Sequence, residues 1–242
     1  MPVLYPPRGK EKSRQKHLGD NGGMSRHVVL AGATGLVGSQ VLRMLLDDPD
    51  VAEVIALTRR PLEIPHPKLV PAVVDFDHLD NFVLPAVDDC FLCLGTTIRN
   101  AGSQDAFRAV DLVLPWTIAK MALAVGATRC FVVSAMGADP RSGVFYNRVK
   151  GELEAELAAL PFRTVVAFRP SLLDGDRAEH RLGERAALTL LRPVAALIPA
   201  QYRPVTAFAV ARAIVTIARR DEVGRMIIES GAIQRIAREQ GN

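Results

Sequence analysis

The sequence is poor in aromatic residues and has no long apolar runs, and each shortage excludes a class of protein. Aromatic residues make up 5% of the 242 residues, which leaves little for the stacking surfaces of nucleic-acid readers. No apolar run reaches the ~18 residues of a membrane span, because Lys120 and the dipeptide of Arg192 and Pro193 interrupt the two closest segments. The charged N-terminus is followed by no apolar core, so a secretory signal is not predicted.

Charge of one sign is concentrated in a single place. The formal net charge is +4, and six basic residues stand in the first 26 positions against two acidic ones. The basic residues are Arg8, Lys10, Lys12, Arg14, Lys16 and Arg26, and the acidic ones are Glu11 and Asp20. The rest of the chain is close to neutral. We therefore predict no nucleic-acid partner, which would need a folded basic face.

Only three cysteines are present, Cys90, Cys93 and Cys130, and all lie in apolar runs. Three thiols cannot form a disulfide framework. Cys90 and Cys93 have CxxC spacing, but no second pair and no histidine cluster completes a zinc site. We interpret the three as small apolar residues in buried strands and predict no metal site. Reduced thiols favour a cytoplasmic location.

From residue 25 onward, apolar runs of strand length alternate with segments that have a helical apolar face. Strands are predicted at 27–31, 54–57, 69–74, 89–94, 129–133 and 164–168, and helices at 38–46, 116–125 and 146–160. This alternation predicts a doubly wound parallel sheet, the Rossmann fold, in a single domain over 24–242 with a small C-terminal substrate segment. Residues 1–23 are predicted to be a disordered extension. An alternative start of the protein is Met24.

The first strand runs into a GxxGxxG turn and then a helix. The turn contains Gly32, Thr34, Gly35, Leu36, Val37 and Gly38. Gly32 permits a tight exit from the strand, Gly35 lets the backbone approach a pyrophosphate, and Gly38 lets the helix pack closely. The free N–H groups and positive dipole end of the helix attract phosphate. The turn predicts a dinucleotide site, and the lack of a Gly-Lys-Ser/Thr sequence argues against ATP.

The end of the second strand indicates which dinucleotide is bound. NAD enzymes usually carry an acidic residue there for the ribose hydroxyls, but this chain has Arg59 and Arg60. Guanidinium groups match the 2′-phosphate of NADP in charge and geometry, so NADP(H) is predicted. The alternative is that the arginines only solvate the strand end. Other strand ends are weaker candidates for cofactor contacts: Asp75, Phe76, Cys93, Leu94, Gly95 and Thr96.

The fifth strand ends at Ser134, and Tyr146 and Lys150 follow on the predicted helix. Tyr and Lys at i and i+4 share one helix face. Hydride transfer to a carbonyl leaves an alkoxide that needs a proton, and the reverse reaction needs a base. A free tyrosine titrates near ~10, and a neighbouring ammonium favours the phenolate. We therefore predict Tyr146 as acid/base, Lys150 as its activator and a cofactor ribose contact, and Ser134 as a donor to the substrate oxygen.

These residues resemble the atypical short-chain dehydrogenase/reductases, and among them the Tat-interacting-protein-type oxidoreductases and their epimerase-like relatives. The resemblance rests on the glycine turn, the two arginines, residues 93–97, Ser134 and the segment 146–152, and it extends from about residue 24 to the end. It implies a doubly wound sheet, NADP(H) and the three catalytic roles given above. It further implies that Pro170 and Leu172 lie along the nicotinamide.

The chain departs from such relatives at two points. Where many carry an Asn for a proton relay, it has Asp111, and the region after Pro170 is short for a bulky sugar nucleotide. We therefore predict an NADP(H)-dependent oxidoreductase acting on a small carbonyl or alcohol. The alternative is an NADP(H)-binding regulatory or assembly protein without turnover. The apolar stretch 186–198 is interpreted as either a substrate contact or a homodimer face.

Overall fold

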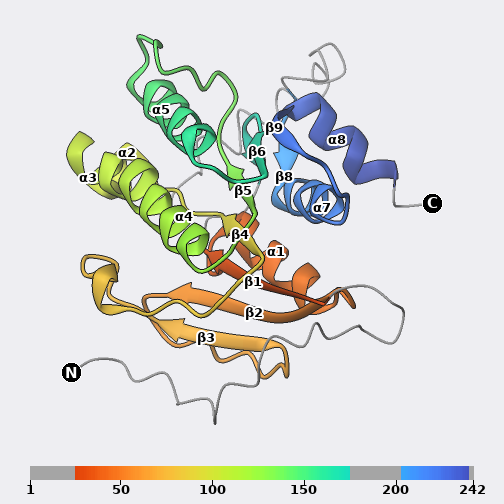
Figure 1. Cartoon of the computed structure of the whole chain (residues 1–242). Helices are drawn as coiled ribbons and strands as arrows, with labels where there is room; N and C mark the ends of the chain where they lie inside the picture. Colours follow the sequence, from red (N-terminus) through yellow and green to blue (C-terminus); the bar gives the residue numbers. More distant parts are fainter. Residues whose placement is uncertain (1–24, 175–202, 240–242) are drawn as a thin grey trace.

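In the computed structural model, which describes residues 25–174 and 203–239, a seven-stranded parallel sheet lies between two layers of helices (Figure 1). The strands are β1 (Arg26–Ala31), β2 (Val51–Thr58), β3 (Leu69–Val73), β4 (Asp89–Leu92), β5 (Arg129–Val133), β6 (Thr164–Arg169) and β9 (Gly224–Glu229). Their order is β3-β2-β1-β4-β5-β6-β9. This order confirms the predicted doubly wound sheet, and the winding reverses between β1 and β4, where such sheets bind ligands.

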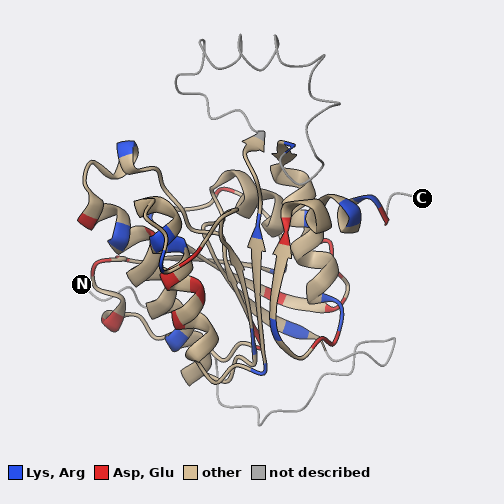
Figure 2. Ribbon diagram, turned by 90° about the horizontal axis from the view of Figure 1, so that it is seen from above, with Lys and Arg blue, Asp and Glu red and all other residues tan. Residues whose placement is uncertain are grey.

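The helices divide between the two faces of the sheet (Figure 2). One face carries α1 (Leu36–Leu46), α7 (Ala207–Ala218) and α8 (Ser230–Glu239), and the other carries α4 (Leu114–Ala124) and α5 (Phe145–Ala159). Before α4 come α2 (Ile98–Ala101), α3 (Gln104–Arg108) and a π-helical segment, η2 (Ala109–Val113). The remaining short elements are a 3-10 turn, η1 (Leu79–Asn81), and the two-residue strands β7 (Leu173–Asp174) and β8 (Val205–Thr206).

Alternation along the strands supplies both halves of the core. In β1, Val28 and Leu30 face α1 and α7, whereas Val29 and Ala31 face α4 and α5, and all four are fully buried. Successive side chains of a strand point to opposite faces, so a central strand covered on both sides is apolar throughout. The helices contribute apolar stripes to the same core, such as Val149, Leu153 and Leu157 on α5.

Several predicted boundaries are corrected by the structure. Helix α1 begins at Leu36, before the predicted position 38, and β4 ends at Leu92, so residues 93 and 94 leave the sheet and enter a loop. The edge strand β9 was not predicted from the sequence. Its residues alternate between half-buried and exposed, so its apolar signal is weak. The predicted extension 1–23 and the apolar stretch 186–198 lie outside the described residues.

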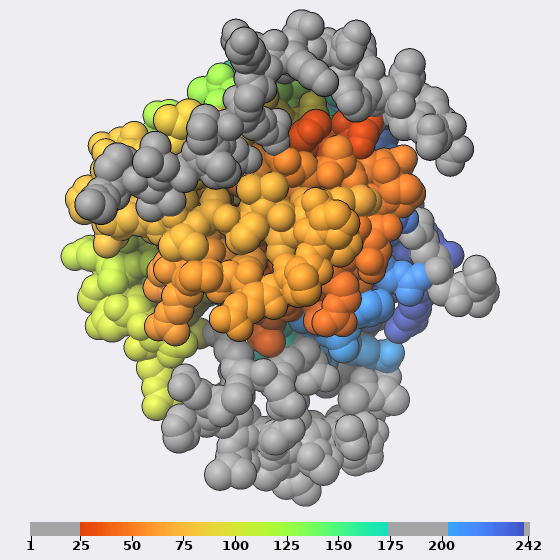
Figure 3. Space-filling model, turned by 90° about the horizontal axis from the view of Figure 1, so that it is seen from below, coloured from red at the N-terminus to blue at the C-terminus, as the bar shows by residue number. Residues whose placement is uncertain are grey.

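The outer surface is mixed in charge. Viewed from above, basic and acidic residues are interspersed on the helices (Figure 2). Viewed from below, the β2 and β3 edge faces the reader, with α2 to α4 on one side and α7 and α8 on the other (Figure 3). Among the helices that the structure describes, none has the length and apolarity needed to cross a bilayer.

Candidate active site

The glycine turn after β1 has the backbone shape that its spacing predicts. Gly32 has φ +90°, and a Cβ on it would lie 2.4 Å from the carbonyl oxygen of Cys93. A Cβ on Gly38 would lie 2.0 Å from the carbonyl oxygen of Gly32. Both contacts are with backbone, which cannot move aside as a flexible side chain can. The two glycines therefore allow β1, α1 and the chain after β4 to approach one another closely.

The start of α1 offers a site for an anion. Gly35 is the N-cap residue, no side chain caps the helix, and no acidic residue occupies its first turn. The first amide groups of a helix have no partner within the helix, and the dipole adds positive potential there. Thr34 and Gly35 are exposed, whereas Val37 is buried beneath them. The backbone donors and the open approach at Gly35 fit a pyrophosphate.

Residues 93–96 lie at the point where the winding of the sheet reverses. Cys93 donates its backbone N–H to the carbonyl of Ala31 at 2.9 Å, which holds the start of this loop against the end of β1. Burial raises the pKa of Cys93 to about 12, so this thiol stays neutral. A Cβ on Gly95 would lie 3.5 Å from Asp111 Oδ1 and 3.8 Å from Lys150 Nζ. The loop therefore lies between the glycine turn and the residues of η2 and α5.

Arg59 and Arg60 follow β2 directly and are exposed. Thr58 is buried and donates its hydroxyl to the carbonyl of Arg60 at 2.8 Å, which fixes the turn in which both arginines stand. Neither guanidinium forms an ion pair with another residue of the described ranges. Within the described ranges, two guanidinium groups without an ion pair therefore stand at the carboxyl end of β2, the strand next to β1.

After β3, Asp75 is already engaged within its own loop. Its carboxylate accepts hydrogen bonds from the backbone N–H of Asp77 at 3.0 Å and, through the other oxygen, contacts His78 Nδ1 at 3.0 Å. The hydrogen bond from His78 lowers the pKa of Asp75, and the same contact raises the pKa of His78. Phe76 packs against the core under α4 and α5. The Asp75 carboxylate thus stabilises the turn after β3.

Helix α5 carries Tyr146 and Lys150, one turn apart. The Tyr146 ring is half-buried and packs at 5.6 Å between centroids against Phe107, which is fully buried. Gly151 is where the preceding loop meets the helix, because a Cβ there would lie 2.2 Å from the backbone carbon of Asp139. Tyr146 and Lys150 share one helix face, and this close contact fixes how near their helix lies to the loop at Asp139 and Pro140.

Lys150 is paired with a carboxylate that lies outside its own helix. Its Nζ lies 2.7 Å from Oδ1 of Asp111, and the two side chains are 4% and 0% exposed. The contact is an ion pair and not an aligned hydrogen bond, because Oδ1 has no hydrogen-bond partner of suitable geometry. The other oxygen of Asp111 accepts the backbone N–H of Thr96 at 2.9 Å. Asp111 therefore joins η2, α5 and the loop after β4.

The Ser134 hydroxyl donates to Glu154 of α5, a residue that the sequence analysis did not identify. Glu154 also accepts from Arg169, at 2.7 Å from Nη2 and 3.0 Å from Nε. Arg169 reaches Glu229 at 3.1 Å as well, and the hydrogen bonds that Arg169 donates to Glu154 raise the pKa of Arg169. Because a hydroxyl has one hydrogen, Ser134 donates to a substrate oxygen only after it turns away from Glu154.

The segment after β6 reaches the same edge of the sheet. Pro170 is buried, and its carbonyl accepts the backbone N–H of Met136 at 2.9 Å, so this segment is tied to the loop that precedes α5. Leu172 is 49% exposed, and its carbonyl accepts the N–H of Val205. The sequence-predicted residues after β1, β4, β5 and β6 thus lie at the carboxyl ends of adjoining strands, with those after β2 and β3 farther along the edge.

Cys90 and Cys130 are fully buried and stand opposite each other on β4 and β5. The three cysteines are free thiols. Among the described residues, no group of three or more His, Cys, Asp or Glu side chains could hold a metal ion.

Curated relatives are similar to this chain over about two thirds of its length. HTATIP2 of Rattus norvegicus is 37% identical over 166 residues, which cover 66% of this chain and 68% of that protein. A mitochondrial FMP52 of Coccidioides immitis is 34% identical over 170 residues, covering 64% and 69%. A mitochondrial FMP52 of Saccharomyces cerevisiae is 33% identical over 159 residues, covering 63% and 68%.

Solved structures agree on the fold. A short-chain dehydrogenase/reductase-family oxidoreductase from Burkholderia thailandensis superposes with a TM-score of 0.61 at 19% identity, covering 86% of this chain and 92% of that one. MoeE5, solved with UDP-glucuronic acid and NAD, gives 0.61 at 19% identity, covering 84% and 75%. No family model matches the chain.

The relatives overturn one prediction. The predicted cytoplasmic location is wrong, because the FMP52 relatives are named as mitochondrial proteins. The prediction rested on unpaired thiols, and a free thiol indicates only surroundings that do not oxidise it, which is not a property of the cytosol alone. The predicted family is confirmed by the same relatives. The chain belongs to the Tat-interacting-protein type of atypical short-chain dehydrogenase/reductases, the family of the HTATIP2 and FMP52 proteins.

Proposed function

We propose that this protein is an NADP(H)-dependent oxidoreductase that transfers a hydride to or from a small carbonyl or alcohol, with Tyr146 as acid/base. One observation carries the proposal. Gly95, at the reversal point of the sheet, lies against Lys150 on one side, and its loop contacts the glycine turn on the other. The residues suited to holding a dinucleotide and the residues suited to proton transfer therefore share one loop.

Each residue of the candidate site has a separate role in the proposed hydride transfer. A bound nicotinamide supplies or accepts the hydride. Tyr146 gives a proton to the alkoxide formed from a carbonyl, or takes one from an alcohol, and the Lys150 ammonium favours the phenolate that the second direction needs. Ser134 orients the substrate oxygen once its hydroxyl leaves Glu154, and Arg169 then remains as the partner of that carboxylate.

The preference for NADP(H) is supported by the end of β2. Arg59 and Arg60 are exposed there, and the strand end offers no carboxylate for the ribose hydroxyls. MoeE5 was solved with NAD, which supports a nicotinamide dinucleotide as the ligand of this fold. The proposal adds that the 2′-phosphate of NADP(H) binds at Arg59 and Arg60. Hydrogen bonds to a charged group contribute about 1.5–3 kcal/mol, which corresponds to a preference of roughly 10- to 150-fold.

Titration of the purified protein with NADPH and NADH tests the binding half of the proposal. We expect tighter binding of NADPH, and loss of that preference in a variant with both Arg59→Ala and Arg60→Ala. Arg43, an exposed arginine in the last turn of α1, provides the matched control, and Arg43→Ala should keep the preference. Equal affinity for both dinucleotides in the unaltered protein would contradict the assignment of NADP(H).

Turnover tests the chemical half. The rate of NADPH oxidation is measured with each of a panel of small carbonyls. Tyr146→Phe should lower this rate by roughly 10²- to 10⁴-fold and leave the NADPH affinity unchanged. If no carbonyl or alcohol is turned over although NADPH binds, the regulatory alternative holds and the proposed reaction is wrong. If Tyr146→Phe leaves turnover intact, another residue is the acid/base.

A further inference from the structure

Asp111 is the buried acidic partner of the residue that the proposed function places beside the tyrosine. Its side chain is fully buried and Lys150 is 4% exposed, with 2.7 Å between Nζ and Oδ1. A charged group without solvent strongly favours its neutral form unless a counter-charge is present. An ammonium this buried is costly without a counter-charge, and only the charged form can favour a phenolate on Tyr146.

The local backbone explains how Asp111 reaches this position. It lies in the π-helical segment η2, which is wider than an α-helix and occurs mostly as single turns, often at functional sites. The segment packs against α5. From there Asp111 presents one oxygen to Lys150 and the other to the backbone N–H of Thr96, in the loop expected to face the cofactor.

We propose that Asp111 is a positioning residue that keeps the Lys150 ammonium charged and holds it against the loop at Gly95 and Thr96. The proposal rests on the proposed oxidoreductase function for its role in turnover. It differs from a proton relay through an amide side chain, because here a carboxylate contacts the ammonium directly. The ion pair itself can be tested without any substrate.

Other charged groups near this pair are already matched. Arg108 of α3 pairs with Glu152 of α5 at 2.6 Å, and Glu154 pairs with Arg169 of β6 at 2.7 Å. Cys93, on the side of β4, is neutral because burial raises its pKa to about 12. On α4, Lys120 lies over the ring of Trp116. Asp111 is thus the carboxylate that faces Lys150 among the described residues.

A double-mutant cycle with Asp111→Asn and Lys150→Met tests the pair. The asparagine keeps an oxygen for the N–H of Thr96 and replaces the oxygen that faces Lys150 with a neutral amide nitrogen. Each single variant leaves one buried ionisable group without its counter-charge and should lower the midpoint of unfolding, and the double variant should recover most of the loss. Recovery is informative even if Asp111→Asn fails to fold alone. Additive losses in the double variant would overturn the proposal.

The charge of Lys150 is read directly by NMR of protein labelled with 13C at the lysine ε-carbons, with Lys150→Met giving the assignment. At pH 8, the Lys150 signal should be that of an ammonium in the unaltered protein and of a neutral amine in Asp111→Asn. An ammonium signal in both would overturn the proposal. This result does not depend on turnover, so it stands apart from any failure of the proposed function.

The pH profile of alcohol oxidation connects the pair to the chemistry. In Asp111→Asn the rising limb should move to higher pH by about one unit or more, toward that of Lys150→Met, and the double variant should coincide with Lys150→Met. Glu152→Gln is the matched control, because it breaks a partly exposed ion pair that also joins α5 to the segment around η2. It should leave the limb in place. An unmoved limb in Asp111→Asn alongside a moved one in Lys150→Met contradicts the proposal.

Discussion

Glu154 accepts hydrogen bonds from two elements at once, and this changes how Ser134 is understood. Ser134 is 4% exposed. Its hydroxyl donates a hydrogen bond to Glu154, which also accepts hydrogen bonds from Arg169. A serine at the end of β5 is the residue expected to face a substrate oxygen, but its single hydrogen is committed to the helix beside it. The type of side chain at position 134 suggests a role in orienting the substrate, and its hydrogen bond to Glu154 limits that role.

The contact between Asp75 and His78 gives a prediction about pH. The pKa of His78 is raised above its ordinary 6.5, so the contact is fully present below pH 6.5 and is lost as the pH rises through the raised value. The pKa of Asp75 is lowered below 3.8, so the contact is present above pH 3.8 and is lost as the pH falls further. The loop is thus held most firmly between these two ordinary values.

NMR of the His78 ring checks this expectation. Its signals should titrate above pH 6.5 in the unaltered protein and return close to 6.5 in Asp75→Asn, which keeps the shape of the side chain and loses its charge. His66, on the loop before β3, gives a reference signal that Asp75→Asn should not move. A His78 titration that is the same in both proteins would show that the contact does not form in solution.

Helix α5 is placed by a glycine that the chemistry does not use. A Cβ on Gly151 would lie 2.2 Å from Asp139 C and 2.3 Å from Pro140 N, both backbone atoms. Because the loop cannot yield as a side chain can, a methyl group here has to push the loop off the helix. The absence of a side chain one residue beyond Lys150 therefore lets the loop pack directly against the helix that carries Tyr146 and Lys150.

Gly151→Ala and the control Gly143→Ala test this account of how the loop packs against α5. Alanine in a helix interior gains about 1 kcal/mol over glycine from intrinsic propensity, whereas overpacking costs about 1–3 kcal/mol and sometimes more. A backbone clash at 2.2 Å decides the sign, so Gly151→Ala should lower both the free energy of unfolding and turnover. Gly143 has no atom within 4 Å of its Cβ position, so Gly143→Ala should change little. Equal denaturant midpoints for the two variants would contradict this account.

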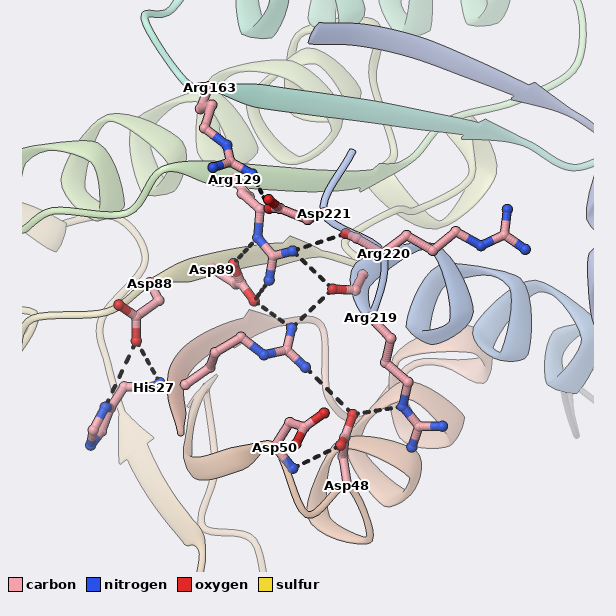
Figure 4. Close-up of polar contacts among 12 residues, drawn as sticks. His27, Asp48, Asp50, Asp88, Asp89, Arg129, Arg163, Arg219, Arg220 and Asp221 are labelled. Atoms are coloured by element: carbon pink, nitrogen blue, oxygen red, sulfur yellow. Dashed lines mark hydrogen bonds and ion pairs between the residues drawn. The ribbon is translucent and has the colours of Figure 1, made fainter. Parts of the chain in front are cut away.

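At the amino ends of the strands, opposite the candidate site, a network of buried charges connects several elements (Figure 4). Asp89, fully buried at the start of β4, accepts two hydrogen bonds from Arg129 at 2.6 Å each and one from Arg26 at 2.9 Å. Both arginines also donate to the carbonyl of Ala218, at the end of α7. Asp48, which follows α1, accepts a hydrogen bond from Arg219 Nε at 3.0 Å. This network ties β1, β4, β5 and α7 together at the amino ends of the strands.

Asp89→Asn is expected to lower the free energy of unfolding by about 3–5 kcal/mol, because it leaves the buried Arg129 guanidinium facing a neutral side chain. Arg26 loses one of its two carboxylates and keeps Asp48 at 3.5 Å. NADPH affinity of the folded variant should stay unchanged, since the candidate site lies at the carboxyl ends of the strands. Asp221→Asn is the control, because its carboxylate is 83% exposed in an ion pair with Arg163, and it should cost no more than about 1 kcal/mol. A large loss of NADPH affinity in Asp89→Asn would show that the two ends are coupled.

Local patterns in the sequence predicted most of the fold, the glycine turn after β1, and the shared helix face of Tyr146 and Lys150. Alternating apolar runs indicated the parallel sheet, and the spacing from Gly32 to Gly38 indicated the turn, because strand alternation and glycine backbone angles depend on residues close in sequence. The shared face of Tyr146 and Lys150 follows from the helix period in the same way. The family predicted from these motifs is the family that the relatives show. The edge strand β9 was missed because half of its residues face solvent.

Only the tertiary structure decided which charges meet. The pairing of Asp111 with Lys150, and of Glu154 with both Ser134 and Arg169, joins residues from separate elements. A carboxylate on one element has many possible partners until the elements pack. Packing then removes the water, and the cost of burying an unpaired charge selects the partner that lies within reach. That choice depends on the register and height of whole helices, which no local pattern in the sequence contains.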